Sequence, residues 1–345
     1  MEVLDNQNVI SQRDPQDALG VIADSATQLT WDAVIEQPND DGFEPSKIIL
    51  TGMGGSAQPG KLAAAWLDLT IPFEVVSNYT LPNHVDDTTL VIASSYSGNT
   101  EETLAVLDDA QNKGARVVAM ANGGKLLDVA RERGIPFVKL MKAPQPRYSA
   151  IAQLRSIAKI LEHYNVAIGI YDEIASLVEP VSELIAGAVA SVNTTDNPAK
   201  QLALACVGKT PIVYSSHLFA PVAYKWKISF NENAKNTSWW NELPEFSHNE
   251  FVGWSSHPIE KPFAIIDLRS DLDHPRVQQR FELTPKLLSG RRPEPHEVWL
   301  HGDSVLCQMI CGFILGDIVS IYLGVLNGVN PTPVELVEKF KQELG

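Results

Sequence analysis

One segment of the chain restricts its fold more than any other. Residues 90–93 are all apolar, residues 95–100 read Ser-Tyr-Ser-Gly-Asn-Thr, and the acidic pair Glu101 and Glu102 follows. A strand that is apolar at every position is typical of a parallel sheet that helices cover on both faces. Glutamates in a first turn mark the start of a helix. The segment therefore predicts a buried strand, a short loop and a helix, the repeating unit of an α/β fold.

The loop between this strand and helix has two interpretations. At a helix start the first backbone N–H groups lack partners and the helix dipole is positive, so a small anion such as phosphate is favoured there. Ser95, Ser97 and Thr100 can add hydroxyl donors, and Gly98 lets the backbone come close to the anion. The alternative is a capped turn with Ser97 or Thr100 as the N-cap. The loop alone leaves both open.

A second loop of the same kind favours the phosphate site. Residues 47–50 predict a strand, and Gly54, Gly55 and Ser56 follow it before a helical stretch at 61–66. The loop has neither the dinucleotide-binding glycine pattern nor the Gly-Lys-Ser/Thr of a P-loop. By itself it is a weak signal. Two such loops at strand ends of one sheet are stronger evidence, because ligands of open α/β folds bind at the carboxyl ends of the strands.

Composition limits the partners. The chain has 345 residues, enough for two domains, and its net charge is −15. Nucleic acid and anionic membranes both favour clustered Lys and Arg, so neither is expected to bind. A phosphorylated small molecule would have to be held by local donors rather than by the overall charge.

The cysteine content and the first 14 residues indicate the cellular compartment in which the protein is expected. Cys206, Cys307 and Cys311 are too few for a disulfide scaffold, and no histidine accompanies them at metal-ligand spacing. Residues 1–14 are polar and acidic, without the features of a signal peptide. We expect buried free thiols in a reducing cytoplasm.

One apolar segment is long enough to cross a membrane. Residues 305–326 are largely apolar, but Asp317 stands near their centre. A central Asp costs about 2.5–3.5 kcal/mol on membrane insertion. We therefore expect a helix buried within a protein core.

The pattern along the chain predicts two α/β halves. In the first half we expect strands near 47–51, 73–76, 89–94, 116–121 and 136–140, and helices near 59–68, 101–113 and 124–133. In the second half we expect strands near 211–214, 250–254, 263–267 and 297–300, and helices near 219–229, 274–286, 304–326 and 331–344. The predicted organisation is an N-terminal domain over 1–150, a helical connection over 151–205 and a C-terminal domain with a terminal helix over 206–345.

The second half contains candidates for acid–base chemistry. Glu232 and His248 bracket a loop that carries Trp239 and Trp240. A carboxylate among amides and aromatic rings can be partly desolvated, which raises its pKa toward neutrality, as a general base requires. Histidine suits reversible proton transfer near pH 7. The alternative is structural: Asn233 is a helix C-cap and His248 is hydrogen-bonded in a turn.

These segments together resemble a known family. The chain contains, in order, Met-Gly-Gly-Ser, Ser-Tyr-Ser-Gly-Asn-Thr-Glu-Glu-Thr, Gln-Pro-Arg, Asn-Glu-Asn-Ala-Lys and Pro-Glu-x-x-His-Asn-Glu, at residues 53–56, 95–103, 145–147, 231–235 and 244–250. It resembles the bifunctional phosphoglucose/phosphomannose isomerase family. The resemblance implies two SIS-type doubly wound αβα domains with parallel sheets, a helical connection and a C-terminal helix.

The resemblance also implies a reaction: the interconversion of glucose 6-phosphate or mannose 6-phosphate with fructose 6-phosphate through a cis-enediolate. It implies a binding site for these sugar phosphates as well. The phosphate would be held by Ser95, Ser97 and Thr100, and the sugar would be lined by Gly54, Gly55, Ser56 and Pro146.

Four residues receive catalytic roles by the same resemblance. Glu232 would move the proton between C1 and C2, and Arg147 would stabilise the charge of the intermediate. His248 would assist ring opening from the partner subunit, which implies a homodimer with a shared active site. Lys341 matches the family's C-terminal lysine, although Lys339 is close. The chemistry needs no metal or organic cofactor.

The sequence departs from the family pattern around the sugar. Ala57, Lys61 and Asn122 stand where other residues are usual, Tyr148 follows Arg147 in place of a small residue, and residues 215–217 replace a more glycine-rich turn. The sequence therefore determines the sugar specificity less closely than it determines the type of reaction. Two alternatives remain: a non-catalytic regulatory protein that binds a sugar phosphate, which Glu232, His248 and Arg147 argue against, and an isomerase of another phosphosugar.

Overall fold

The chain folds into two compact units, each built around its own sheet. The computed structural model describes residues 2–256 and 262–344. One unit contains residues 25–179, and the other combines residues 1–24 with residues 180–345. The first 24 residues thus belong with the C-terminal sheet, and the helical stretch 151–205 is divided between the units. We call the units the N-terminal unit and the C-terminal unit after their sheets.

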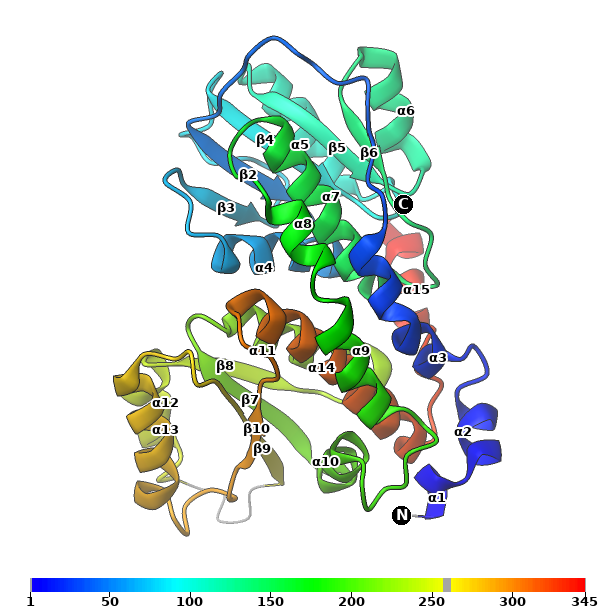
Figure 1. Cartoon of the computed structure of the whole chain (residues 1–345), viewed down its shortest axis with the longest axis vertical. Coiled ribbons are helices and arrows are strands. Elements are labelled where there is room, and N and C mark those ends of the chain that lie inside the picture. The colour runs from blue at the N-terminus through cyan, green and yellow to red at the C-terminus, as the bar shows by residue number, and fades with distance from the viewer. Residues whose placement is uncertain (1, 257–261, 345) are drawn as a thin grey trace. The chain divides into compact units, whose positions relative to one another are not determined.

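The sheet of the N-terminal unit has six strands in the order β1-β6-β5-β4-β2-β3 (Figure 1). Its strands are β1 (Ile35–Glu36), β2 (Lys47–Thr51), β3 (Phe73–Val76), β4 (Thr89–Ser94), β5 (Arg116–Ala121) and β6 (Phe137–Lys139). All neighbours are parallel except the short β1, which pairs antiparallel with β6. The five expected strands of the first half are confirmed; β2, β4 and β5 are largely apolar, whereas β3 and β6 are short and each contains a charged residue.

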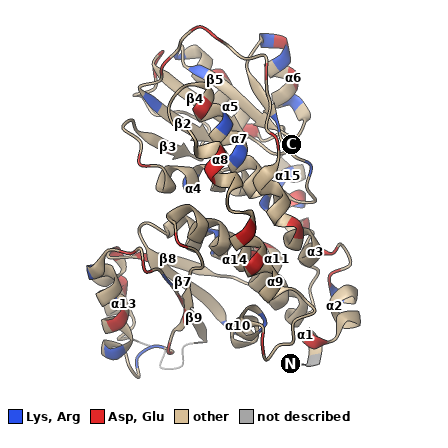
Figure 2. Ribbon diagram, in the orientation of Figure 1, with Lys and Arg blue, Asp and Glu red and all other residues tan. Residues whose placement is uncertain are grey.

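Helices cover this sheet. They are α4 (Gln58–Trp66), α5 (Glu101–Asn112), α6 (Gly124–Arg133), α7 (Ala150–His163) and α8 (Ile170–Ala175), with 3-10 turns η1 (Asp24–Thr30), η2 (Gly54–Ser56) and η3 (Pro146–Ser149). Every residue of β4 is buried, as the uninterrupted apolar run predicts. Charged side chains lie mainly on helices and loops, visibly so on α6 (Figure 2).

The sheet of the C-terminal unit has four parallel strands in the order β10-β9-β7-β8. Its strands are β7 (Thr210–Ser216), β8 (Trp239–Leu243), β9 (Phe263–Arg269) and β10 (His296–Trp299). Its helices and turns are α1 (Glu2–Asp5), α2 (Gln7–Arg13), α3 (Ala18–Ala23), α9 (Val178–Ala188), α10 (Pro198–Cys206), α11 (Ala220–Asn233), η4 (Glu245–His248), α12 (Glu250–Gly253), α13 (Pro275–Leu287), α14 (Val305–Asn327) and α15 (Glu335–Leu344).

The prediction for this sheet is wrong at one strand. Residues 250–254 were expected to form a strand, but Glu250–Gly253 is the short helix α12. The strand is instead β8, in the segment that the sequence pattern treated as a loop with two tryptophans. Trp239 is exposed, so the segment lacks the apolar run that marked the other strands. Pairing with β7 decides its structure.

Helix α14 is the core helix of this unit. By length and composition it could cross a membrane, but 89% of its most apolar window is buried inside the protein. It packs against α11 and α10. Burial by neighbouring helices accounts for its apolar sequence, as expected from the central Asp317.

Candidate active site

The two predicted glycine and hydroxyl loops meet in the N-terminal unit. Both follow neighbouring parallel strands, β2 and β4, at their carboxyl ends. The hydroxyl of Ser56 accepts a hydrogen bond from the backbone N–H of Tyr96 at 3.0 Å, which joins the loops directly. Gly54 has a φ of +50°, a value that favours glycine. The structure therefore brings Gly54, Gly55 and Ser56 beside the loop at 95–100.

Ser95 and Ser97 have different environments within the loop. Ser95 is buried, its hydroxyl lies 2.7 Å from that of Thr100, and it accepts the N–H of Gly98 at 3.1 Å. Ser97 is exposed, and its hydroxyl accepts the N–H of Asn99. Thr100 is the N-cap of α5 by position, but its side chain caps no N–H group of the helix. The start of α5 thus keeps the donors that an anion would use, with Ser97 on the accessible side.

Gly98 is required by close packing. Its φ is +69°, and a Cβ atom there would lie 1.8 Å from the carbonyl oxygen of Gly123. The loop at residues 122–125 crosses at this point: the side-chain oxygen of Asn99 accepts the N–H of Lys125, and Leu126 N–H donates to the Gly98 carbonyl. The sequence did not indicate that the loop at 122–125 supports the loop at 95–100, because the residues in contact are more than twenty positions apart.

The Gln-Pro-Arg segment reaches the same place. A Cβ atom on Gly55 would lie 3.1 Å from the backbone nitrogen of Arg147, so turns η2 and η3 touch at backbone distance. The hydroxyl of Tyr96 is hydrogen-bonded to the backbone of Ala143, just before η3. Burial raises the pKa of Tyr96. Pro146 and Arg147 therefore lie next to the glycine loop, as the site prediction requires.

The departures from the family pattern receive structural explanations in part. Tyr148 is 2% exposed, and the guanidinium carbon of Arg147 lies 4.6 Å from its ring centre. The ring thus lies against the predicted cation. The Asn122 side-chain amide donates to the carbonyl of Leu140 at 2.8 Å, a link between the ends of β5 and β6. Ala57 is buried, and Lys61 lies in α4.

Gln58, one residue further, carries a feature that the sequence did not reveal. Its side chain is 1% exposed, and neither polar atom of its amide has a hydrogen-bond partner among the described residues. A buried amide without partners costs free energy. It adjoins the glycine loop, which makes it a residue to vary when specificity is tested.

The remaining predicted residues belong to the C-terminal unit. Glu232 lies in the last turn of α11 and is partly exposed. Burial raises the pKa of the nearby Tyr224 hydroxyl, and the charge of Glu232 raises it further. The Tyr224 ring also contacts Trp240 edge-on, with ring centres 5.8 Å apart. The predicted aromatic neighbourhood of Glu232 is therefore present. Asn233 is not the helix C-cap, which is Ala234; its side chain is buried inside the unit.

Glu232 and His248 of one chain lie at opposite edges of the sheet. Asn236, just after α11, donates to the carbonyl of Lys209, which precedes β7 at its amino end. His248 is exposed in η4, after the carboxyl end of β8. The seven residues of β7 span about 20 Å at roughly 3.3 Å per residue, so the two side chains are separated by that order of distance. The structure does not bring them together within the chain.

Lys341 lies on α15, an amphipathic helix with no buried residue. Leu336, Phe340 and Leu344 form an exposed apolar stripe along it. At 100° per residue, Lys341 and Lys339 fall on opposite sides of this stripe. Both lysines remain candidates for the C-terminal position.

Residues 2–256 and 262–344 contain no group of three or more His, Cys, Asp or Glu side chains placed to hold an ion. The three cysteines are buried and unbonded.

Comparison with known proteins identifies the family. A model described as the bacterial phospho-glucose isomerase C-terminal SIS domain matches residues 195–344, and one for the SIS domain matches residues 43–135. A bifunctional phosphoglucose/phosphomannose isomerase of Aquifex aeolicus is 34% identical, over 92% of this chain and 95% of its own. The chain belongs to the bifunctional phosphoglucose/phosphomannose isomerase family. It is thus a phosphosugar isomerase of the SIS-domain type, and the expected α/β architecture with two parallel-sheet domains is confirmed.

Other relatives agree on the family and differ on the substrate. The enzyme of the same name from Caldicellulosiruptor bescii is 37% identical, over 86% of this chain and 89% of its own. A relative from Sulfolobus acidocaldarius, 28% identical over 86% of this chain and 88% of its own, is named D-glucosamine-6-phosphate 4-epimerase. A solved structure of a glucose-6-phosphate isomerase like protein from Thermus thermophilus shares the fold, with a TM-score of 0.66 and 20% identity over 99% of both chains.

Proposed function

We propose that this member of the family interconverts glucose 6-phosphate or mannose 6-phosphate with fructose 6-phosphate. The observation that supports the proposal most is the meeting of the loops at 54–56 and 95–100 with Arg147 at one edge of the first sheet. This arrangement combines a helix start for the phosphate with a buried cation for the intermediate. Family membership supplies the sugar isomerase chemistry.

The proposed reaction moves one proton between carbons. With the phosphate held by the start of α5, Ser97 and Thr100, Glu232 removes the proton from C2 of the open-chain aldose. The resulting cis-enediolate carries negative charge, which Arg147 stabilises. Glu232 then returns the proton to C1 while the hydroxyl proton passes from O2 to O1, so the ketose forms without a change in atoms or electrons. A carboxylate that accepts and returns the proton fits one base serving both steps.

We propose that the complete site needs two chains. Glu232 and His248 of one chain lie about a strand length apart, on opposite edges of the same sheet. His248 can assist ring opening at the substrate of Glu232 only if it comes from a second copy. The proposed assembly is therefore a homodimer in which each active site contains residues of both chains, and Lys341 of α15 would contribute a further side chain to the site. We place it in the cytoplasm, where its three thiols would stay reduced.

A second candidate substrate follows from the relative named as an epimerase of glucosamine 6-phosphate. Tyr148 against Arg147 and the unpartnered amide of Gln58 alter the surroundings of the glycine loop. An amino sugar phosphate is therefore the alternative to test beside the neutral hexose phosphates. A regulatory protein without catalysis is less favoured, because the acid–base residues are all present.

The test is a coupled assay of the purified protein. Fructose 6-phosphate is supplied, and glucose 6-phosphate is followed through an NADP-dependent dehydrogenase, with mannose 6-phosphate and glucosamine 6-phosphate assayed in parallel. Glu232→Gln should lower turnover at least about a thousandfold, since removing a central general base costs at least what general-base catalysis supplies, while leaving sugar-phosphate binding nearly unchanged. Turnover retained in this variant would remove Glu232 as the base. Binding without turnover in the wild type would favour the regulatory alternative.

A further inference from the structure

Helices α11 and α14 of the C-terminal unit pack at backbone distance. The face of α14 that meets α11 repeats a small residue every fourth position: Gly312, Gly316, Ser320 and Gly324. A Cβ atom on Gly316 would lie 2.6 Å from the ring of Trp226, and one on Gly324 would lie 2.7 Å from the carbonyl oxygen of Asn233. Close-packed surfaces of this kind leave α11 little freedom to slide or rotate.

A buried polar network fixes the register of the two helices. Asp317 on α14 accepts hydrogen bonds from the Lys225 ammonium and the Ser229 hydroxyl of α11, both at 2.7 Å. The Asn233 amide donates to the Ser320 hydroxyl at 2.9 Å. The side chains of Lys225 and Asp317 are 0% and 6% exposed. Such buried pairs add little net stability, but any slip would leave a charge unpaired, so they select one arrangement.

The end of α11 is held at further points. Lys235 donates to the backbone carbonyl of Glu232 at 2.7 Å and to that of Pro331 at 2.9 Å. Asn327, the last residue of α14, donates to the carbonyl of Ala234 at 3.2 Å. The residues that follow Glu232 therefore tie the end of α11 to the backbone of the segments beside it, although Lys235 itself is exposed.

We infer that Asn233 and Asp317 are positioning residues for Glu232. Asn233 is adjacent to Glu232 in the last turn of α11, and its bond to Ser320 sets how far that turn is rotated about the helix axis. Asp317, through Lys225 and Ser229, sets where α11 lies along α14. Together they direct the Glu232 carboxylate, which the proposed function makes the base; the inference rests on that assignment. Misplacing a catalytic group by about 1 Å can cost about a hundredfold in rate.

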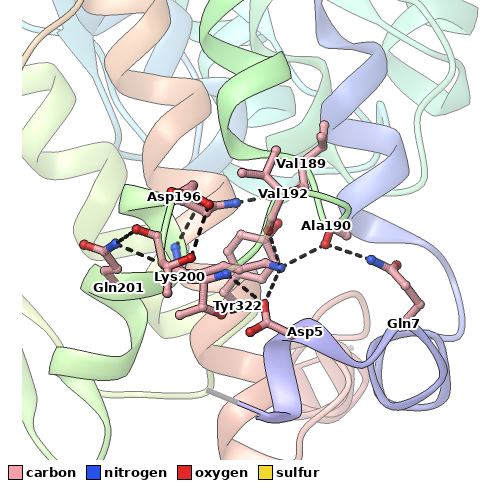
Figure 3. Close-up of polar contacts among 12 residues, drawn as sticks. Asp5, Gln7, Val189, Ala190, Val192, Asp196, Lys200, Gln201 and Tyr322 are labelled. Carbon is pink, nitrogen blue, oxygen red and sulfur yellow. Dashed lines mark hydrogen bonds and ion pairs between the residues drawn. The ribbon is translucent and has the colours of Figure 1, made fainter.

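The same unit offers a matched control. Lys200 of α10 is fully buried, pairs with Asp5 at 3.4 Å and donates to the carbonyls of Ala190 and Val192 (Figure 3). Its ammonium lies 5.7 Å from the ring centre of Tyr322, so it also packs on α14. This cluster ties the N-terminal segment to the unit and, among the described residues, makes no hydrogen bond to α11. Lys200→Met should therefore destabilise the unit without moving Glu232.

The experiment measures the reactivity of Glu232 directly. The probe is a hexitol 6-phosphate with an epoxide at C1–C2: an ionised carboxylate opens the ring, forms an ester, and the released alkoxide takes a proton to become a hydroxyl. Peptide mass spectrometry gives the rate of ester formation at Glu232. We expect Asn233→Ala to slow labelling about tenfold, Ser320→Ala about threefold, and Lys200→Met less than twofold. The Asn233 and Ser320 effects should be less than multiplicative in the double variant, since they share one bond.

The outcomes separate the inference from the proposed function. Labelling of Asn233→Ala at the wild-type rate, or equal slowing in Lys200→Met, would overturn the inference, as would wild-type labelling at another residue. If Asn233→Ala does not fold, Ser320→Ala decides, because it keeps Asn233 and removes the acceptor of its amide, with only a local bond to the Asp317 carbonyl lost besides. Wild-type labelling at Glu232 without isomerase turnover would contradict the proposed function, and the labelling rates would still decide the positioning.

Discussion

The candidate residues of the two sheets lie at opposite ends of the strands: at the carboxyl ends in the first sheet, and, for Glu232, at the amino ends in the second. At the carboxyl edge of the first sheet, glycines with positive φ and exposed hydroxyls surround the start of α5, whose N-cap leaves the helix uncapped by a side chain. At the carboxyl ends of the second sheet, the side chains of Ser304 and His274 cap α14 and α13, while the start of α11, after Phe219, has no side-chain cap. Its candidate base, Glu232, lies at the other edge. Helix starts that are already capped have fewer donors to offer an anion.

The two units share the arrangement of helices packed on a parallel sheet, but the proposed function gives them different roles: one binds the phosphate and the other positions the base. In the proposed site, the carboxyl ends of the first sheet's strands would hold the phosphate, as the strand ends of open α/β folds hold their ligands. The second contributes through the end of a helix whose register is fixed by a buried network. A shared fold therefore does not imply a shared site.

The largest effect should come from testing the two ends of the second sheet apart, with the substitution of Glu232 on one chain and that of His248 on another. Glu232→Gln and His248→Ala should each be nearly inactive, but dimers formed from both should contain one intact site of two. With random pairing, the mixture should regain about a quarter of wild-type turnover, from nearly none. Turnover is measured on the co-expressed mixture, and again on the separated mixed dimers, which should reach about half of the wild-type value because one of their two sites is intact.

A control keeps that result specific. Dimers of Glu232→Gln with a chain carrying both substitutions contain no intact site, so they should stay inactive. If the mixed dimers of the two single variants also stay inactive, Glu232 and His248 do not act in one shared site.

A smaller effect should come from the glycine that shapes the phosphate loop. Gly98→Ala places a methyl group against Gly123 and imposes a strained φ, so we expect kcat/KM for the hexose phosphate to fall about a hundredfold, in line with a few kcal/mol of strain. Gly134→Ala is the matched control: its φ is +65°, but a Cβ atom there meets no other atom within 4 Å. It should lower thermal stability slightly and leave kinetics unchanged.

The smallest effect should come from one hydroxyl. Ser97→Ala removes a proposed phosphate contact in the ground state, so KM should rise about tenfold while kcat changes little, as expected for one hydrogen bond to a charged group. Ser46→Ala, an exposed serine before the amino end of β2, should change neither. An unchanged KM in Ser97→Ala would remove that hydroxyl from the site.

Most of the fold could be predicted because its signals are local. Strands β2, β4 and β5 are largely apolar runs, and α11, α13 and α14 fall where helices were expected, near 219–229, 274–286 and 304–326. Strand β8 was missed because its tryptophans are exposed or half exposed and only pairing with β7 holds it extended. The assignment of residues 1–24 to the C-terminal unit was missed for a related reason: bonds such as Asp5 to Thr194 join residues far apart in the chain.

The sequence by itself determined the α/β class, the two phosphate-loop candidates, the family and the identity of the candidate residues, because these are short patterns of neighbouring residue types. The tertiary structure decided that Ser56 joins the two loops, that Gly98 must accommodate Gly123, and that Glu232 and His248 of one chain lie at opposite sheet edges. It also showed that Asn233 and Asp317 meet inside the core. These relations depend on contacts between distant segments, which form only when the strands pair and the helices pack.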